Sequence, residues 1–257
     1  MPRFAANLSM LFNEVPLMQR FDRAGAAGFR AIEFLFPYDE DVPAIKDALD
    51  RNGLEQILFN LPAGNFGAGE RGIANDPARV QEFRDGVGRA LEIAAALNVP
   101  RLNCLAGLTL PDMPYEKQID TLCANLEYAA EQAQSAGVRQ LLEPLNTIDT
   151  PGFIVPTSSM ALKLLDRIGH ANLWLQYDFY HQQRMEGNIT AAFAEYLPRI
   201  AHVQIADSPA RHQPGTGEIQ YPFVFQAIDD SGYDGWVSLE YRPLGTTEES
   251  LSWMTEA

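Results

Sequence analysis

The chain has 257 residues, of which 46% are hydrophobic and 21% charged, and its 19 glycines and 17 prolines are spread along its length. This composition is that of a globular protein and excludes disordered, collagen-like and low-complexity chains. With 34 acidic against 19 basic residues, the formal net charge is −15, which opposes binding to nucleic acid and to anionic lipid. We therefore expect neither a nucleic-acid nor a membrane partner.

Targeting and redox signals are absent from the sequence. The first residues lack the apolar core of a signal peptide, and no segment approaches the roughly 18 apolar residues of a membrane span. Cys104 and Cys123 are too few for a disulfide framework and do not form a C-x-x-C motif. We expect a cytoplasmic protein.

Short apolar runs alternate with longer amphipathic runs from one end of the chain to the other. Strands are predicted at residues 4–10, 31–35, 55–61, 101–105, 140–143, 173–177, 200–205 and 236–240. Helices are predicted at residues 15–27, 42–52, 77–97, 116–136, 158–168, 189–197, 221–231 and 247–255. Helix-boundary residues agree with these ranges: Asp76-Pro77 predicts a start, Asn52-Gly53 and Ala136-Gly137 predict ends, and Thr246 or Thr247 precedes an acidic first turn.

Eight strand–helix units predict parallel strands with right-handed crossovers. Because about 250 residues is the usual size of such a fold, we predict an α/β protein consisting of a single (β/α)8 TIM barrel, with residues 1–257 as one domain. The glycine-rich segment 64–69 is not followed by the helix start and acidic residue of a dinucleotide site, so a doubly wound sheet is disfavoured. In such barrels, catalytic residues lie at the carboxyl ends of the strands.

Polar side chains end four successive predicted strands, and we expect them to converge at the barrel mouth. They are Glu143, Asp178, Gln204 and Glu240. Oxygen ligands of this kind suit Mg²⁺ or Mn²⁺, and a divalent cation would relieve the repulsion among three acids. The alternative is that each residue simply ends its strand in solvent. Within the seventh strand, the residues alone leave open whether Gln204 or His202 faces the barrel axis.

His181 lies three residues after Asp178, on what we predict to be the same loop. From there an imidazole could hydrogen-bond a substrate oxygen, although a lone histidine is more often structural. We expect His170 and His212 to be structural or exposed.

Nine short motifs are distributed along almost the whole chain. They are Asn7-Leu8-Ser9-Met10, Glu33-Phe34-Leu35-Phe36-Pro37-Tyr38, Asn60-Leu61-Pro62-Ala63-Gly64, Gly69-Glu70-Arg71-Gly72-Ile73, Glu143-Pro144-Leu145-Asn146, Gln176-Tyr177-Asp178 with His181, Gln204-Ile205-Ala206-Asp207, Pro214-Gly215-Thr216-Gly217-Glu218 and Glu240-Tyr241. Together they resemble the hydroxypyruvate isomerase family of the xylose-isomerase-like TIM-barrel superfamily. The 2-oxo-tetronate isomerases share most of them.

The resemblance implies roles for particular residues. The family's metal ligands match Glu143, Asp178, Gln204 and Glu240, and its acid/base pair matches Glu143 and Glu240. It also implies that His181 and Arg211 contact substrate, with Asp149 as a weaker candidate. Related ketose 3-epimerases usually have histidine at the position of Gln204, which makes an epimerase the less favoured alternative.

The implied reaction interconverts hydroxypyruvate and tartronate semialdehyde by proton transfer through an enediolate, with Mg²⁺ or Mn²⁺ as cofactor. The hydroxy-oxo acid substrate carries a carboxylate, and Arg71, Arg211 and Arg242 follow predicted strands from which they could bind it. The segments 62–64, 69–73 and 151–153 resemble the hydroxypyruvate branch more than the 2-oxo-tetronate branch. All three lysines lie in predicted helices, which disfavours a hydride shift assisted by lysine.

Other functions have sequence requirements that can be compared with this chain. A 2-oxo-tetronate isomerase shares the site pattern. An AP endonuclease-like nuclease of the same superfamily would need several zinc ions, many histidines and a basic surface, whereas this chain has four histidines and a charge of −15. A non-catalytic barrel would have lost the ligand set, which is intact here. A homo-oligomer is possible.

Overall fold

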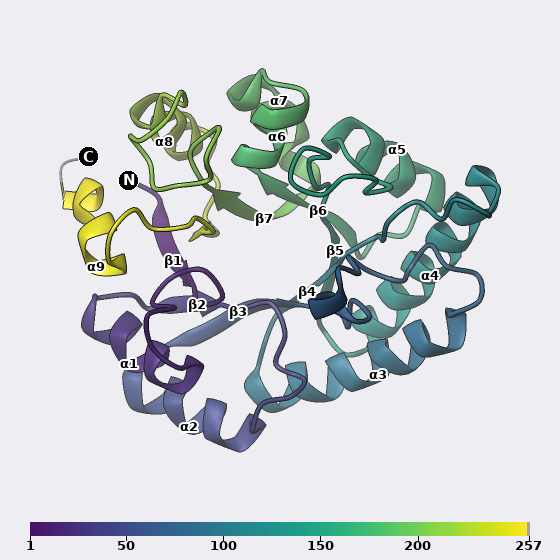
Figure 1. Ribbon diagram of the computed structural model, residues 1–257, viewed down its shortest axis with the longest axis horizontal. Coiled ribbons are helices and arrows are strands. Elements are labelled where there is room, and N and C mark those ends of the chain that lie inside the picture. Colours follow the sequence, from purple (N-terminus) through teal and green to yellow (C-terminus); the bar gives the residue numbers. More distant parts are fainter. Residues whose placement is uncertain (256–257) are drawn as a thin grey trace. The chain divides into compact units, whose positions relative to one another are not determined.

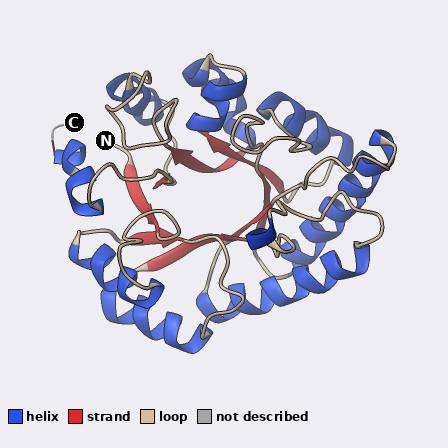
Figure 2. Cartoon of the chain, in the orientation of Figure 1, coloured by secondary structure: helices blue, strands red, loops and turns tan. Residues whose placement is uncertain are grey.

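The computed structural model describes residues 1–255. Within them, parallel strands follow one another in chain order as a closed barrel, β1 to β8, with helices between them (Figures 1 and 2). The strands are β1 (Arg3–Asn7), β2 (Ala31–Glu33), β3 (Glu55–Asn60), β4 (Arg101–Cys104), β5 (Arg139–Leu142), β6 (Leu173–Asp178), β7 (Ile200–Ile205) and β8 (Trp236–Leu239). The predicted (β/α)8 fold is confirmed.

The helices occupy the connections between strands. They are α1 (Leu17–Ala26), α2 (Val42–Asn52), α3 (Val80–Leu97), α4 (Tyr115–Ser135), α5 (Ser158–Ile168), α6 (Phe179–Met185), α7 (Ile189–Tyr196), α8 (Tyr221–Asp230) and α9 (Thr247–Ser250). Short 3-10 helices are η1 (Phe66–Ala68), η2 (Leu197–Arg199) and η3 (Ser252–Thr255). No helix among the described residues is both long and apolar enough to cross a membrane.

The chain divides into two compact units. The first comprises residues 1–35, 40–57 and the chain from Tyr177 onward, and the second comprises residues 36–39 and Leu58–Gln176. The division passes through β3 and β6, so each of these strands continues from one unit into the other. The assignment of residues 1–257 to one domain remains a prediction.

Each unit has its own apolar core. In the first, Phe4 of β1 packs edge-on against Phe225 of α8, with ring centroids 5.3 Å apart. In the second, helices α3 and α4 bury regularly spaced apolar side chains, such as Phe83 and Val87 in α3 and Leu122 and Leu126 in α4. This spacing is the helical period that identified both segments in the sequence.

Several predicted boundaries are accurate because local capping determines them. Helix α2 ends at Gly53, which has a left-handed φ of 61°, and α9 begins with a capping box between Thr246 and Glu249. The prediction that Asp76-Pro77 starts a helix is wrong. The carboxylate of Asp76 accepts the N–H of Ala78 in a separate turn, and α3 begins only at Val80.

The prediction for the segment after β6 is also wrong. Residues 179–185, predicted as a loop, form helix α6 directly after the strand, with Asp178 as the residue that caps its N-terminus. At the other end of the chain, the predicted helix 247–255 consists of α9 and then η3.

Candidate active site

The four predicted strand-end side chains are all buried. Asp178 is the last residue of β6, Gln204 lies near the end of β7, and Glu143 and Glu240 directly follow β5 and β8. Their exposed fractions are 4% for Glu143, 3% for Asp178, 1% for Gln204 and 5% for Glu240. The alternative that these residues merely end their strands in solvent is therefore wrong.

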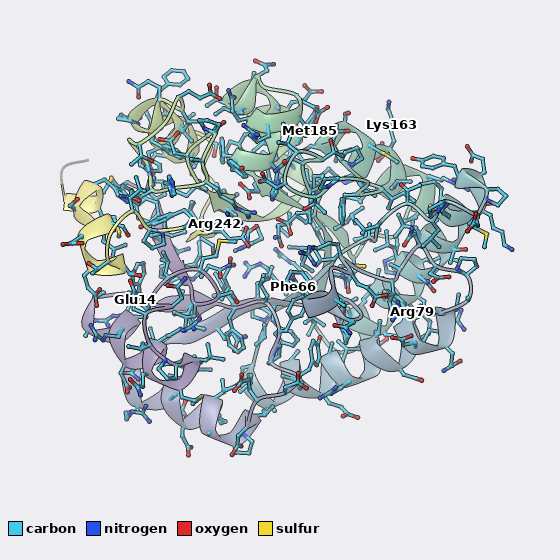
Figure 3. All side chains as sticks on the ribbon, viewed as in Figure 1. Glu14, Phe66, Arg79, Lys163, Met185 and Arg242 are labelled. Carbon is cyan, nitrogen blue, oxygen red and sulfur yellow. The ribbon has the colours of Figure 1, made fainter. Side chains whose placement is uncertain are left out.

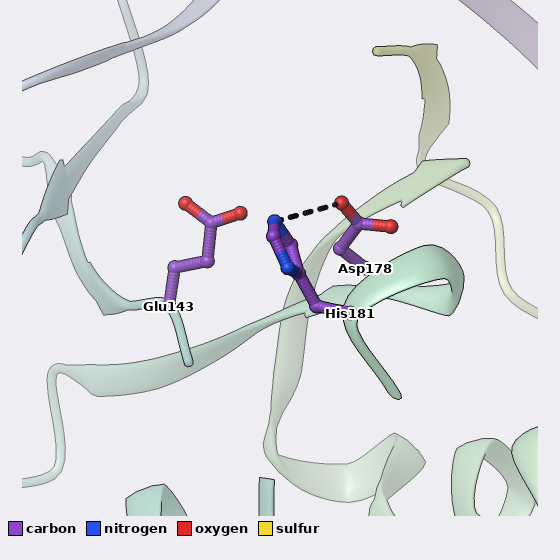
Figure 4. A group of neighbouring side chains, drawn as sticks. All are labelled: Glu143, Asp178 and His181. Carbon is purple, nitrogen blue, oxygen red and sulfur yellow. Dashed lines mark ion pairs between the residues drawn. The ribbon is translucent and has the colours of Figure 1, made fainter. Parts of the chain in front are cut away.

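Asp178 has a double role at the start of α6. Its Oδ1 accepts the backbone N–H of Tyr180 at 2.7 Å, while its Oδ2 lies 3.6 Å from Nε2 of His181 (Figure 4). Burial, together with the charge of Arg211, lowers the pKa of His181 well below its usual value. His181 is therefore neutral and lies in the first turn of a helix rather than on a loop.

Arg211 joins two of the acids. Its Nη2 lies 2.6 Å from Oε2 of Glu240 and 3.7 Å from Oδ2 of Asp178. Burial raises the pKa of Glu240 to about 8 and that of Asp178 to about 6, although the positive charge of Arg211 opposes both shifts. Two carboxylates with strongly perturbed pKa values beside one guanidinium are typical of a catalytic centre.

The loop that carries Arg211 is held by the carboxylate of Asp207. Asp207 Oδ2 accepts the backbone N–H groups of Gly215, Thr216 and Gly217, and Oδ1 accepts those of Ser208 and Ile219. Arg211 itself has a left-handed φ of 60°. This backbone conformation, which non-glycine residues rarely adopt, is supported by five hydrogen bonds to one side chain.

Glu33, at the end of β2, is a site residue that the sequence analysis missed. It is fully buried and contacts Gln204 at 2.7 Å and His202 at 2.7 Å. The question left open for β7 is thereby answered, because His202 and Gln204 both face Glu33. No strand-end pattern marks Glu33 in the sequence, because the apolar residues Phe34-Leu35-Phe36 follow it directly.

Glu143 belongs to the second unit, where one amide donates a hydrogen bond to it. Asn103 of β4 donates to Oε2 of Glu143 at 2.9 Å and also to Asn60 of β3 at 3.1 Å. Glu143 is drawn in Figure 4 with Asp178 and His181, and these three are side chains of the kinds that bind divalent metals.

The remaining predicted substrate residues, Arg71, Asp149 and Arg242, lie in loops. Arg71 donates to the backbone carbonyls of Phe66 and Glu70 and lies over the ring of Phe66, 4.1 Å from its centroid. Arg242, labelled in Figure 3, has an exposed side chain, and its backbone N–H donates to Arg211. Asp149 accepts a hydrogen bond from Asn146 in the loop after β5.

The two remaining histidines contact the backbone, and the three lysines lie in helices. His170 accepts the backbone N–H of Asn172, and His212 contacts the carbonyl oxygen of Arg242 at 2.7 Å. The lysines Lys46, Lys117 and Lys163 lie in α2, α4 and α5, as predicted.

Comparison with known proteins identifies the family. The model of the xylose isomerase-like TIM barrel family matches residues 21–257. The chain is 49% identical to hydroxypyruvate isomerase of Escherichia coli (strain K12), over 99% of this chain and 98% of that protein. It is 44% identical to 2-oxo-tetronate isomerase of Cupriavidus necator, over 99% and 98% of the two chains.

Solved structures agree with this fold. A crystal structure described as AP endonuclease, family 2, from Brucella melitensis superimposes with a TM-score of 0.97 at 43% identity, covering 100% of this chain and 99% of that one. The barrel, the buried acids at its strand ends and the full-length similarity to two isomerases all indicate the same family. The chain therefore belongs to the xylose isomerase-like TIM barrel family and is an isomerase of that family.

Proposed function

We propose that this isomerase interconverts hydroxypyruvate and tartronate semialdehyde by proton transfer at a site that holds one divalent cation. The observation that carries the proposal is the buried pair of Glu240 and Asp178 beside Arg211, whose Nη2 lies 2.6 Å from Glu240 and 3.7 Å from Asp178. A buried carboxylate beside positive charge is suited to accept a proton from carbon and to return it. The choice of substrate is supported by the 49% identity to the Escherichia coli hydroxypyruvate isomerase.

The chemistry of the site fits a cation. Oδ2 of Asp178 is buried and has no hydrogen-bond partner among the described residues, although it lies near two nitrogen atoms. A buried carboxylate oxygen without a hydrogen bond is costly unless a positive charge is close to it. Three carboxylates and one carboxamide would supply oxygen ligands, so we propose Glu143, Asp178, Gln204 and Glu240 as the ligands of Mg²⁺ or Mn²⁺.

A bound divalent cation would polarise the substrate carbonyl and stabilise the negative charge that develops as a C–H bond ionises. The protein residues then have to move one proton between two carbons. In the forward direction, a glutamate takes a proton from C3 of hydroxypyruvate and returns it to C2, while the hydroxyl proton passes from O3 to O2. We assign the carbon-proton transfers to Glu143 and Glu240.

His181 and the arginines serve substrate binding in this proposal. Neutral His181 is able to donate or accept a hydrogen bond at a substrate oxygen. Arg211, whose side chain is 12% exposed, provides positive charge inside the cluster of acids. Arg71 and Arg242 are the proposed additional partners of the substrate carboxylate, since a guanidinium binds carboxylates with two parallel hydrogen bonds.

The four-carbon 2-oxo-tetronate is the alternative substrate, and it is favoured by the 44% identity to the Cupriavidus necator enzyme. The name of the Brucella melitensis structure raises the nuclease alternative. The net charge of −15 argues against this alternative, because DNA binding depends on neutralising phosphates with basic side chains.

Steady-state assays with hydroxypyruvate, 2-oxo-tetronate and ketohexoses, each with Mg²⁺ or Mn²⁺ and with EDTA, test the proposed function. We expect the largest kcat/KM with hydroxypyruvate and loss of activity in EDTA. A larger kcat/KM for 2-oxo-tetronate would overturn the choice of substrate, and full activity after removal of metal would overturn the cation site.

A further inference from the structure

Glu33 lies at the centre of a buried hydrogen-bond cluster in the first unit. Its Oε1 accepts from Nε2 of Gln204 at 2.7 Å and from Nδ2 of Asn7 at 2.9 Å. Its Oε2 contacts Nε2 of His202 at 2.7 Å and accepts from Oγ of Ser238 at 2.7 Å. Four side chains from β1, β7 and β8 thus converge on one carboxylate at the end of β2.

This cluster determines which way the carboxamide of Gln204 points. An ionised carboxylate has no hydrogen to donate, so the side chain of Gln204 has to present its NH₂ group to Oε1 of Glu33, which also accepts from Asn7. The carbonyl oxygen of the same amide is then directed away from Glu33. Only the carbonyl oxygen of an amide binds Mg²⁺ or Mn²⁺, because the nitrogen has no free electron pair for a cation.

Asn7 extends the effect of Glu33 to one of the proposed bases. Its Oδ1 accepts the backbone N–H of Ser9 at 3.0 Å, which fixes the orientation of its amide. Its Nδ2 then lies within hydrogen-bond distance of both Glu33 and Oε1 of Glu240, the latter at 3.4 Å. Glu33 is therefore connected to Gln204 directly and to Glu240 through Asn7.

We propose that Glu33 is a positioning residue, which holds the carboxamide of Gln204 with its oxygen available to the cation and, through Asn7, restrains Glu240. The proposal rests on the proposed function, because it assumes the cation site. Without a carboxylate at position 33, the amide of Gln204 would be free to turn over and present its NH₂ group to the cation. A residue that only joined β1, β2, β7 and β8 would affect stability and leave cation binding unchanged.

The first test is the Mn²⁺ affinity of Glu33→Gln, measured by titration with detection of free Mn²⁺ by electron paramagnetic resonance. An amide at position 33 is able to donate to Gln204 and so to reverse its orientation. We expect Mn²⁺ to bind about 10- to 100-fold more weakly, as for other residues that orient metal ligands. Ser238→Ala is the matched control, since it removes a hydrogen bond to the opposite oxygen of Glu33 and should change the affinity less than about threefold.

The second test reverses the donor and the acceptor. In the double variant Glu33→Gln/Gln204→Glu, the amide at position 33 donates to a carboxylate at position 204, whose other oxygen is available to the cation. We expect Mn²⁺ affinity to recover at least tenfold relative to Glu33→Gln. A carboxylate at position 204 also strengthens Mn²⁺ binding by its charge, so a purely structural role predicts no recovery beyond the gain that Gln204→Glu alone produces. The double variant keeps the test valid if the single variant folds poorly.

The outcomes separate this proposal from the function it rests on. Wild-type protein that binds no Mn²⁺ would refute the cation site and the role of Glu33 together. Wild-type binding with an unchanged affinity in Glu33→Gln, or equal losses in Glu33→Gln and Ser238→Ala, would refute the role of Glu33 alone. Weaker binding in Glu33→Gln that the double variant restores would support it.

Discussion

At the scale of single residues, Glu240 combines burial, a neighbouring positive charge and a raised pKa. Its Oε2 pairs with Arg211 at 2.6 Å, and burial raises its pKa to about 8. In the metal-free protein this group therefore changes its protonation state near neutral pH, whereas a bound cation would keep it ionised and able to accept a proton from carbon.

The substitution Glu240→Gln removes the proton acceptor and one proposed ligand while preserving the size of the side chain. We expect kcat to fall by at least about 10³-fold, a loss within the range for removal of an acid/base group. The circular dichroism spectrum should not change. The matched variant Glu248→Gln alters an exposed carboxylate in α9 and should retain activity. A Glu240→Gln enzyme with kcat within tenfold of wild type would exclude Glu240 as a base.

At the scale of elements, the sequence predicted regular segments well and the loops around the site poorly. Strand β7 and helices α2 and α5 have the predicted ends, because apolar periodicity and capping residues define them locally. Helix α6 was missed since its seven residues are too few to show a helical period. The left-handed backbone at Arg211 depends on hydrogen bonds to Asp207 from residues farther along the chain, which no local pattern reveals.

The sequence predicted only some residues of the candidate site. Residues that follow apolar strands, such as Asp178 and Glu143, were recognised from their position alone. Glu33 ends a strand of only three residues and is followed by Phe34-Leu35-Phe36, so the apolar run hides the strand end. Its role follows only from the hydrogen bonds that side chains of β1, β7 and β8 donate to it in the folded protein.

The loop after β7 supplies a prediction at this scale. Asp207→Asn replaces one of two acceptor oxygens with an NH₂ group that faces backbone N–H donors. We expect the free energy of unfolding to fall by about 1–3 kcal/mol. Because Arg211 lies on this loop, we also expect kcat/KM to fall more than about tenfold, the equivalent of about 1.4 kcal/mol. Asp230→Asn, at the end of α8, is the control. Destabilisation without loss of kcat/KM would show that the loop does not position Arg211 for the reaction.

At the scale of the whole molecule, the buried acids should make stability depend on pH. The pKa of Asp178 rises from 3.8 to about 6 and that of Glu240 from 4.5 to about 8 on folding. Between about pH 4 and pH 8 these two groups bind more protons in the folded protein than in the unfolded chain, so their contribution to the stability of the metal-free protein falls as pH rises. Neutral His181 has the opposite effect below pH 6.5, but it is one group against two. Ligands of a cation have to be deprotonated, so bound Mn²⁺ should stabilise the protein more at high pH.

Thermal unfolding at pH 5 and pH 8, with EDTA and with saturating Mn²⁺, measures this dependence. We expect the Tm in EDTA to fall between pH 5 and pH 8, and the increase in Tm caused by Mn²⁺ to be larger at pH 8. In Glu240→Gln the pH dependence in EDTA should be weaker. Equal pH dependence in wild type and Glu240→Gln would contradict the assigned titration of Glu240.

The central claim is that the barrel isomerises a hydroxy-oxo acid by moving a proton between carbons through a carboxylate. The most direct measurement is the isotopic composition of tartronate semialdehyde formed from hydroxypyruvate in D₂O, determined at low conversion in the presence of Mn²⁺. A carboxylate that holds the proton is able to exchange it with solvent, so we predict deuterium at C2 of the product. Product that retains the substrate hydrogen completely, with no deuterium at C2, from protein that binds a second metal ion at full occupancy would contradict proton transfer and indicate a hydride shift.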